Sequence, residues 1–181
     1  MFDIKLCRDK LSLMMSSSYR NIGRAVLEFE DYLKKYHLKE ESISKAMVVL
    51  RELLDNAVKH GNMGDSQDKV IVKIGFFGSD LFRIEVKDNG CGFDYNILDT
   101  SIPSNPKIKG RRGYILIAEY ADRIDFNKQG NRITVHLTLT RESKHHNALP
   151  ELALPTRAKG HQPDLEYHPI LTRNNYKLHR M

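Results

Sequence analysis

The spacing of the apolar residues changes abruptly between residues 60 and 70, and this change restricts the possible folds most. Before it, apolar residues recur every three to four positions over 22–36 and 43–57, which predicts two helices. The second helix is expected to begin near Ser42 and to end at His60, before Gly61. After it, "KVIVKIGFF" and "LFRIEVKD" alternate apolar with polar residues, which predicts a hairpin joined by "GSD".

Three further segments extend this pattern. Residues 2–14 carry short apolar alternations typical of one or two strands, and "GYILIAEYAD" predicts a short helix. "DRIDFN" and "RITVHLTL" predict a second strand pair joined across "KQGN". A mostly antiparallel sheet with one apolar face and three main helices on that face predicts an α/β fold, a two-layer sandwich.

The chain divides by composition into a domain at 1–140 and a tail at 141–181. Of 181 residues, 40% are hydrophobic and 29% are charged, as in a globular domain. The tail holds four of the six prolines and five of the eight histidines, and it lacks a sustained apolar period. We expect a basic, Pro/His-rich tail, flexible or docked. Metal binding through His145 and His146 is a weak alternative, because ordered ligands need a scaffold.

Several classes of protein are disfavoured. No apolar stretch approaches the roughly 20 residues of a membrane helix, and charges interrupt the start of the chain, so we expect a cytoplasmic protein without a membrane partner. Cys7 and Cys91 fit neither a disulfide framework nor a zinc site and are interpreted as reduced thiols. The net charge of +6 is spread along the chain, which argues against nucleic-acid binding.

The stretch "VKDNGCGFD" ends a predicted strand with one carboxylate and two glycines, Asp88, Gly90 and Gly92. It is neither a Walker loop nor a dinucleotide fingerprint, and its glycines stand where a calcium loop needs oxygen ligands. Glycines allow positive φ and close approach of a ligand, and a hairpin turn explains one of them better than two. The stretch is therefore either a tight turn or a ligand site.

Polar side chains follow a four-residue spacing on the second predicted helix. Glu52, Asn56 and His60 fall along one side of it, beside the apolar stripe. This is either a solvated helix face or the border of a site. Asparagine and carboxylate oxygens suit magnesium, which needs only one or two protein oxygens when phosphates and water supply the rest.

A basic segment precedes the third predicted helix. In "KIKGRRGYILI", Lys107, Lys109, Arg111 and Arg112 come just before Gly113, where free backbone N–H groups and the helix dipole favour a phosphate. A basic loop exposed to solvent is the alternative interpretation.

In this order, the three elements resemble the GHKL ATPase superfamily, which includes gyrase, a heat-shock chaperone, mismatch-repair ATPases and histidine kinases. "ELLDNAVKHGN" resembles its N box, "VKDNGCGFD" its first glycine box and "KGRRGYILI" its second. The resemblance covers roughly residues 8–140 and implies the Bergerat-type ATP-binding fold. It is strongest to the bacterial anti-sigma factor serine/threonine kinases, which bind ATP and phosphorylate a small STAS-domain antagonist.

The resemblance also implies roles for individual residues. Asp88 would accept a hydrogen bond from the adenine amino group, while Gly90 and Gly92 let adenine and the lid pack against the backbone. Asn56 would coordinate magnesium, and Glu52 would be the general base. The implied phosphate contacts come from the second box, namely from Lys109, Gly110, Arg111, Arg112 and Gly113. His60 would shape the pocket rather than act in catalysis.

One departure and several alternatives accompany this hypothesis. Relatives usually show two glycines separated by one residue before the aliphatic run, whereas Arg112 precedes a single Gly113 here.

The implied partners are a STAS-domain anti-anti-sigma protein, a sigma factor and a second copy of the chain in a homodimer. The main alternative is a GHKL module that binds ATP and a partner without transferring phosphate. A histidine kinase would need a phosphoacceptor helix upstream, for which the chain is too short.

Overall fold

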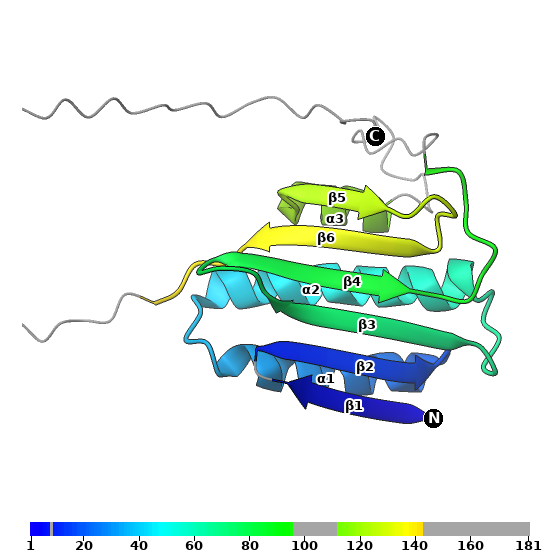
Figure 1. Cartoon of the computed structure of the whole chain (residues 1–181), viewed down its shortest axis with the longest axis horizontal. Coiled ribbons are helices and arrows are strands. Elements are labelled where there is room, and N and C mark those ends of the chain that lie inside the picture. Colours follow the sequence, from blue (N-terminus) through cyan, green and yellow to red (C-terminus); the bar gives the residue numbers. More distant parts are fainter. Residues whose placement is uncertain (8, 96–111, 143–181) are drawn as a thin grey trace, which may run out of the picture. The chain divides into compact units, whose positions relative to one another are not determined.

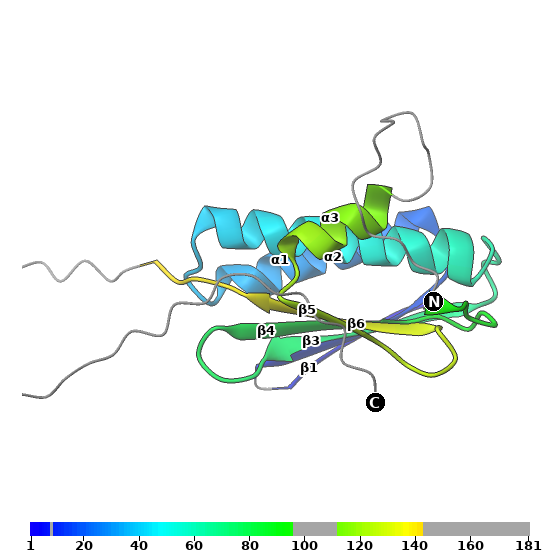
Figure 2. The same ribbon diagram turned by 90° about the horizontal axis from the view of Figure 1, so that it is seen from above.

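The computed structural model describes residues 1–7, 9–95 and 112–142. In this part of the chain, six strands form one sheet and the helices cover one of its faces (Figures 1 and 2). The predicted two-layer α/β sandwich is therefore confirmed. The elements are β1 (Phe2–Cys7), β2 (Lys10–Ser16), α1 (Tyr19–Lys34), α2 (Glu40–Asn56), the π-helical turn η1 (Ala57–Gly61), β3 (Lys69–Phe76), β4 (Leu81–Lys87), α3 (Arg112–Tyr120), β5 (Arg123–Phe126) and β6 (Arg132–Thr138).

The strand order is β1-β2-β3-β4-β6-β5, and every neighbouring pair is antiparallel (Figure 1). The chain leaves the sheet after β4, passes through α3, re-enters the sheet as the edge strand β5, and continues with β6, which lies between β5 and β4. Lys87 at the end of β4 is thereby paired with Arg132 at the start of β6. This pairing brings the loop after β4 next to the β5–β6 turn, although about forty residues separate them in the sequence.

Apolar and polar residues alternate along the strands, and the apolar ones form the core. The predicted apolar faces of the two central strands, at 70–74 and 82–86, are buried against the helices. Phe29 and Tyr32 of α1 meet Phe82 of β4, with ring centroids 6.0 and 6.5 Å apart. Burying a large side chain contributes about 1.5–3 kcal/mol, so this contact ties the helical layer to the sheet.

The second helix differs from its predicted bounds at both ends. It begins at Glu40 rather than near Ser42, and its last turn, 57–61, is π-helical. The Asn62 N–H donates to the Ala57 carbonyl at 2.8 Å, a bond that closes this wide turn. Single π turns often occur at functional sites, and this one shifts the residues after Asn56 away from the α-helical spacing. The four-residue spacing therefore describes Glu52 and Asn56 but not His60.

The predicted tail falls mostly outside the described residues. Only its first two residues, Arg141 and Glu142, are described. Arg141 forms an isolated bridge with Leu38, and the Glu142 N–H donates to the His37 carbonyl at 2.8 Å. The rest of the tail, including His145 and His146, is not described, so its role stays a prediction. Within the described ranges, no helix is both long and apolar enough to cross a membrane.

Candidate functional site

Asp88 stands at the end of β4, half-buried, at the start of the loop that the sequence singled out. The Gly90 N–H donates to Asp88 Oδ1 at 2.9 Å, and the Asp88 N–H donates to the Asn131 carbonyl at 3.1 Å. Burial raises the pKa of the Asp88 carboxyl, and the Gly90 N–H opposes this rise. A partly desolvated carboxylate in a fixed position is a strong hydrogen-bond acceptor for a ligand.

The glycines around Asp88 are required by close backbone packing. A Cβ at Gly61 would lie 2.6 Å from Asp88 Oδ2, and one at Gly90 would overlap the Gly61 carbonyl oxygen. Gly92 has φ +79°, and a Cβ there would overlap the Gln129 carbonyl oxygen. The two glycines of the stretch thus bring the loop against η1 on one side and the β5–β6 turn on the other. Their contact with adenine stays a prediction.

Two buried asparagines that the sequence did not reveal as functional hold the loop. Asn62 accepts from the Asn89 N–H at 2.9 Å and donates to the Lys69 carbonyl at 3.1 Å. Asn131 donates to the carbonyls of Asp88 and Gly90 at 3.4 and 3.3 Å. In the sequence, both asparagines look like ordinary turn residues. Only the strand order shows that Asn131 lies opposite the end of β4.

A second group of residues gathers where α2 meets the start of α3. Glu52 and Asn56 lie one helical turn apart, and Gly113 is close to both. A Cβ at Gly113 would lie 2.6 Å from Glu52 Oε2 and 3.7 Å from Asn56 Nδ2. The structure therefore brings together three residues that the sequence placed in two separate motifs. Gly113 is also in the first turn of α3, so the positive end of the helix dipole faces this carboxylate.

The surroundings of this group are suited to a ligand. Burial raises the pKa of the Glu52 carboxyl, and the nearby charge of Asp55 raises it further. Within the described residues, Asn56 Nδ2 is buried and has no hydrogen-bond partner. Because a rotation of the amide exchanges its nitrogen and oxygen, the same position can present Oδ1. One amide oxygen beside phosphate oxygens and water is a donor set that fits magnesium.

Tyr114 connects the two groups. It follows Gly113 in α3, and its ring centroid lies 6.1 Å from that of Phe93 in the loop. Burial raises the pKa of Tyr114 to about 12, and the charge of Asp88 adds to the rise. Tyr114, which follows Gly113, is thus close enough to Asp88 for the Asp88 charge to raise its pKa. Tyr114 therefore lies between the Glu52 group and the loop after β4, a position that the sequence analysis did not single out.

Some predicted site residues are exposed or lie outside the described residues. His60 is exposed, and the contacts to the loop come from its neighbours Gly61 and Asn62. Lys107, Lys109, Gly110 and Arg111 lie outside the described residues, and only the backbone of Arg112 is described. The phosphate contacts expected of these residues stay a prediction.

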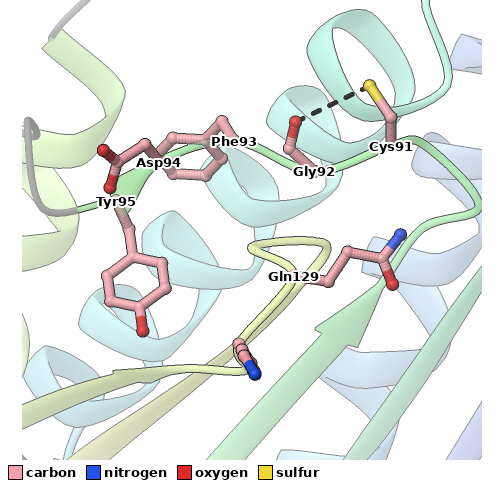
Figure 3. Close-up of a pocket in the computed structure, with 7 residues that line it drawn as sticks. Cys91, Gly92, Phe93, Asp94, Tyr95 and Gln129 are labelled. Atoms are coloured by element: carbon pink, nitrogen blue, oxygen red, sulfur yellow. Dashed lines mark hydrogen bonds between the residues drawn. The ribbon is translucent and has the colours of Figure 1, made fainter.

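An open pocket of about 430 Å³ lies along the same loop (Figure 3). Phe93 and Tyr95 lie on the loop, and Gln129 comes from the β5–β6 turn. The Tyr95 ring stacks on Phe126 at 5.0 Å. Glu52, Asn56 and Asp88 are not among the described lining residues, so this pocket borders the site rather than containing its polar groups. The described lining residues are Cys91, Gly92, Phe93, Asp94, Tyr95, Lys128 and Gln129.

Comparisons with known proteins bear on the family and the fold of the chain. Residues 15–137 match the model of the histidine kinase-like ATPase domain family. Among solved structures, the chain is similar to the RsbU and RsbW domains of Rv1364c from Mycobacterium tuberculosis, with a TM-score of 0.50 and 16% sequence identity. The likeness covers 73% of this chain but only 32% of that one, and it concerns the fold. No curated protein sequence matches significantly. Because the family model spans most of the chain and includes all three motifs, the chain belongs to the histidine kinase-like ATPase domain family.

Proposed function

We propose that this protein is an ATP-dependent serine/threonine kinase of the anti-sigma factor type, which phosphorylates a STAS-domain partner. The observation that carries the proposal is the position of Glu52, a partly buried carboxylate beside Asn56 and the start of α3. Membership of the ATPase family supports nucleotide binding. The fold likeness to a protein containing an RsbW domain is in keeping with the anti-sigma type.

Asp88 would select adenine. Its carboxylate accepts a hydrogen bond from the adenine amino group, whereas guanine has a carbonyl oxygen at that position. Leaving a buried acceptor unpaired costs about 1–3 kcal/mol, so guanine nucleotides are disfavoured. The loop needs little rearrangement to bind, because Asn62, Asn131 and the glycine contacts already hold it.

Asn56 would hold magnesium through its side-chain oxygen. The bound ion supplies positive charge that neutralises the phosphates during transfer. Asn56 is suited to this role because its amide nitrogen is already buried and unpaired in the described residues. Gly113 lies close to Asn56 in the first turn of α3, and the N-terminus of a helix favours anions such as a phosphate oxygen.

Glu52 would act as the general base. It takes the proton of the serine or threonine hydroxyl as that oxygen forms a bond to the γ-phosphorus and the bond to the β–γ bridging oxygen breaks, releasing ADP. A base works best when its pKa is near the working pH, and burial moves the pKa of Glu52 in that direction.

The proposed partners follow from this activity. A STAS-domain anti-anti-sigma protein is the phosphate acceptor, and a sigma factor is the alternative binding partner whose release the phosphorylation controls. The chain would act as a homodimer in the cytoplasm of a bacterial cell.

The test is a transfer assay with γ-labelled ATP, magnesium and candidate STAS proteins from the same genome. We expect label on a serine or threonine of one partner, lost with Glu52→Ala and with Asn56→Ala. ATP binding without transfer to any STAS protein would instead favour a switch module that works by partner binding alone. Unchanged ATP affinity in Asp88→Asn would overturn the site itself.

A further inference from the structure

The helices of the described part of the chain all lie on one side of the sheet. Figure 2 shows α1, α2 and α3 on that side of the strands. Along the central strands, buried apolar residues alternate with residues that point to the opposite side, which we call the outer face. The strand register therefore decides which charges lie beside one another on the outer face.

One row of residues crosses the outer face near the β3–β4 turn. Lys10 of β2 lies opposite Gly75 of β3, which lies opposite Arg83 of β4. Arg83 lies opposite His136 of β6, and His136 lies opposite Arg123 of β5. A Cβ at Gly75 would lie 3.1 Å from Lys10 Cγ, so the Lys10 side chain passes close to this glycine. We call Lys10, Arg83 and Arg123 the Arg83 row.

A second row lies at the other end of β4. Lys87 lies opposite Arg132 of β6, and Lys69 of β3 stands two residues before Ile71, the partner of Lys87. Lys69, Lys87 and Arg132 are all exposed, and we call them the Lys87 row. Like charges directly opposite each other destabilise a sheet. The pairing of Lys87 with Arg132 is therefore one that a bound anion would relieve.

The positions between the two rows are close to neutral. Lys73 Nζ lies 3.5 Å from Glu85 Oε1, directly across β3 and β4. On β5, Asp125 pairs with Arg123 of the Arg83 row at 2.8 Å. The positive charge of the outer face is consequently strongest along the two rows and weakest between them.

The outer face as a whole is basic. With Lys5 and Lys73 added to the two rows, its strands carry eight Lys or Arg against three acids, Asp3, Glu85 and Asp125. The described residues together hold equal numbers of basic and acidic residues, so the helices and loops carry the balancing acids. The spread of charge along the sequence argued against nucleic-acid binding, but the fold gathers the bases on one face.

The two rows have a spacing close to that of the phosphate chains of a duplex. Arg83 and Lys87 are four residues apart on one strand, so their Cα atoms lie about 13 Å apart. Two phosphate chains border the major groove of duplex DNA, which is about 12 Å wide. We propose that the outer face binds the backbone of duplex nucleic acid, with the Lys87 row on one phosphate chain and the Arg83 row on the other. Such contacts read no base sequence.

Other occupants match this surface less well. A lipid surface has no paired lines of charge, and proteins that lie on it insert apolar side chains. On the outer face, Phe77 and Leu81 are only 37% and 41% exposed, and the Arg83 guanidinium lies 4.1 Å from the Phe77 ring centroid. The tail at 141–181 holds more Lys and Arg than Asp and Glu, so its charge does not complement the outer face. The inference does not depend on the proposed kinase activity.

The first test measures the affinity of the full-length chain for a labelled DNA duplex of about 20 base pairs. Fluorescence anisotropy is recorded between about 50 and 200 mM salt, because each phosphate contact contributes about 0.9 to the slope of log K against log salt. Lys87→Gln/Arg132→Gln should raise the dissociation constant about tenfold at the lower salt and reduce the slope by about two. The matched control is Lys34→Gln/Lys45→Gln, which removes the same charge from exposed positions on α1 and α2 and should leave the affinity within about twofold.

The second test compares the two rows with the positions between them. Lys10→Gln/Arg83→Gln should weaken duplex binding about as much as the Lys87-row variant, whereas Lys73→Gln/Glu85→Gln removes a neutral pair and should not. Circular dichroism melting checks that each variant is folded.

Four outcomes would overturn the proposal. These are no duplex binding at the lower salt, variants in the two rows that bind as the wild type does, and an equal loss in the Lys34→Gln/Lys45→Gln control. The fourth is binding to vesicles of phosphatidylcholine and phosphatidylserine through the same residues without binding to the duplex, which would assign the outer face to a membrane surface.

Discussion

The two ends of the candidate site differ in how completely their polar groups are satisfied. At the Asp88 end, Gly90 bonds the carboxylate, and the buried Asn62 and Asn131 bond the backbone of the loop. At the Glu52 end, Glu52 is partly buried and Asn56 has an unpaired amide nitrogen, and Gly113 packs closely against Glu52. One end is organised before any ligand binds, and the other has polar groups that a ligand would complete.

The difference has a physical meaning. Hydrogen bonds that are formed in advance lower the entropic cost of binding, which suits an end that recognises a rigid base. Buried groups without partners are costly, and folded proteins keep them mainly where a ligand or a reaction uses them. We therefore expect substitutions at the Glu52 end to affect chemistry and those at the Asp88 end to affect affinity.

Glu52→Gln should produce the largest effect. The amide keeps the shape of the side chain but cannot accept the hydroxyl proton, so transfer to the STAS partner should slow about 10²–10⁴-fold while ATP affinity changes little. Initial rates and equilibrium ATP binding measure the two quantities separately. The matched control is Glu41→Gln, because Glu41 is exposed at the start of α2 and forms a salt bridge with Lys45. Equal losses of rate and affinity would remove the distinction between the ends.

Asp88→Asn should give the next largest effect, on affinity. Loss of the acceptor toward adenine should weaken ATP binding by about 1–3 kcal/mol, or roughly 5- to 150-fold. Stability should be kept, since an amide oxygen can still accept from the Gly90 N–H. Isothermal titration calorimetry measures the affinity, and Asp80→Asn in the exposed β3–β4 turn is the control.

Gly61→Ala tests whether the loop is held by close packing. The added Cβ would collide with the Asp88 carboxylate, and overpacking of this kind costs about 1–3 kcal/mol. We expect lower stability in urea together with weaker ATP binding. Gly23→Ala is the opposite case: nothing lies within 4 Å of its Cβ position in α1, and replacing a glycine within a helix should stabilise by about 0.5–1 kcal/mol. If Gly61→Ala left both stability and ATP affinity unchanged, the loop at the Asp88 end would not depend on this close packing.

The smallest expected effect is on the pH dependence of stability. Burial raises the pKa of Glu52 above its value in the unfolded chain, so the folded state binds more protons between the two values. This contribution to the free energy of unfolding is therefore present at acid pH and is lost as the pH rises through the folded pKa. The free energy of unfolding, measured with urea between pH 4 and 7, should decline less steeply with rising pH in Glu52→Gln than in the wild type. A steeper decline would contradict burial as the dominant cause.

The elements and their faces were predictable because periodicity is a local property. Apolar residues spaced for helices and strands identified α1, α2 and the β3–β4 and β5–β6 hairpins. The π turn at 57–61 was not predicted. It depends on how the end of α2 packs against the loop after β4, which the spacing of apolar residues does not encode.

The sequence by itself determined which residue types the site contains: Glu52 and Asn56 one turn apart, Asp88 at a strand end, and Gly113 at a helix start. Tertiary structure alone decided that these motifs meet and which residues support them. Asn131 reaches Asp88 because β6 returns beside β4, and Gly61 touches Asp88 because η1 ends against the loop. Such contacts join segments distant in the chain, so their energy depends on strand order and helix packing rather than on any local pattern.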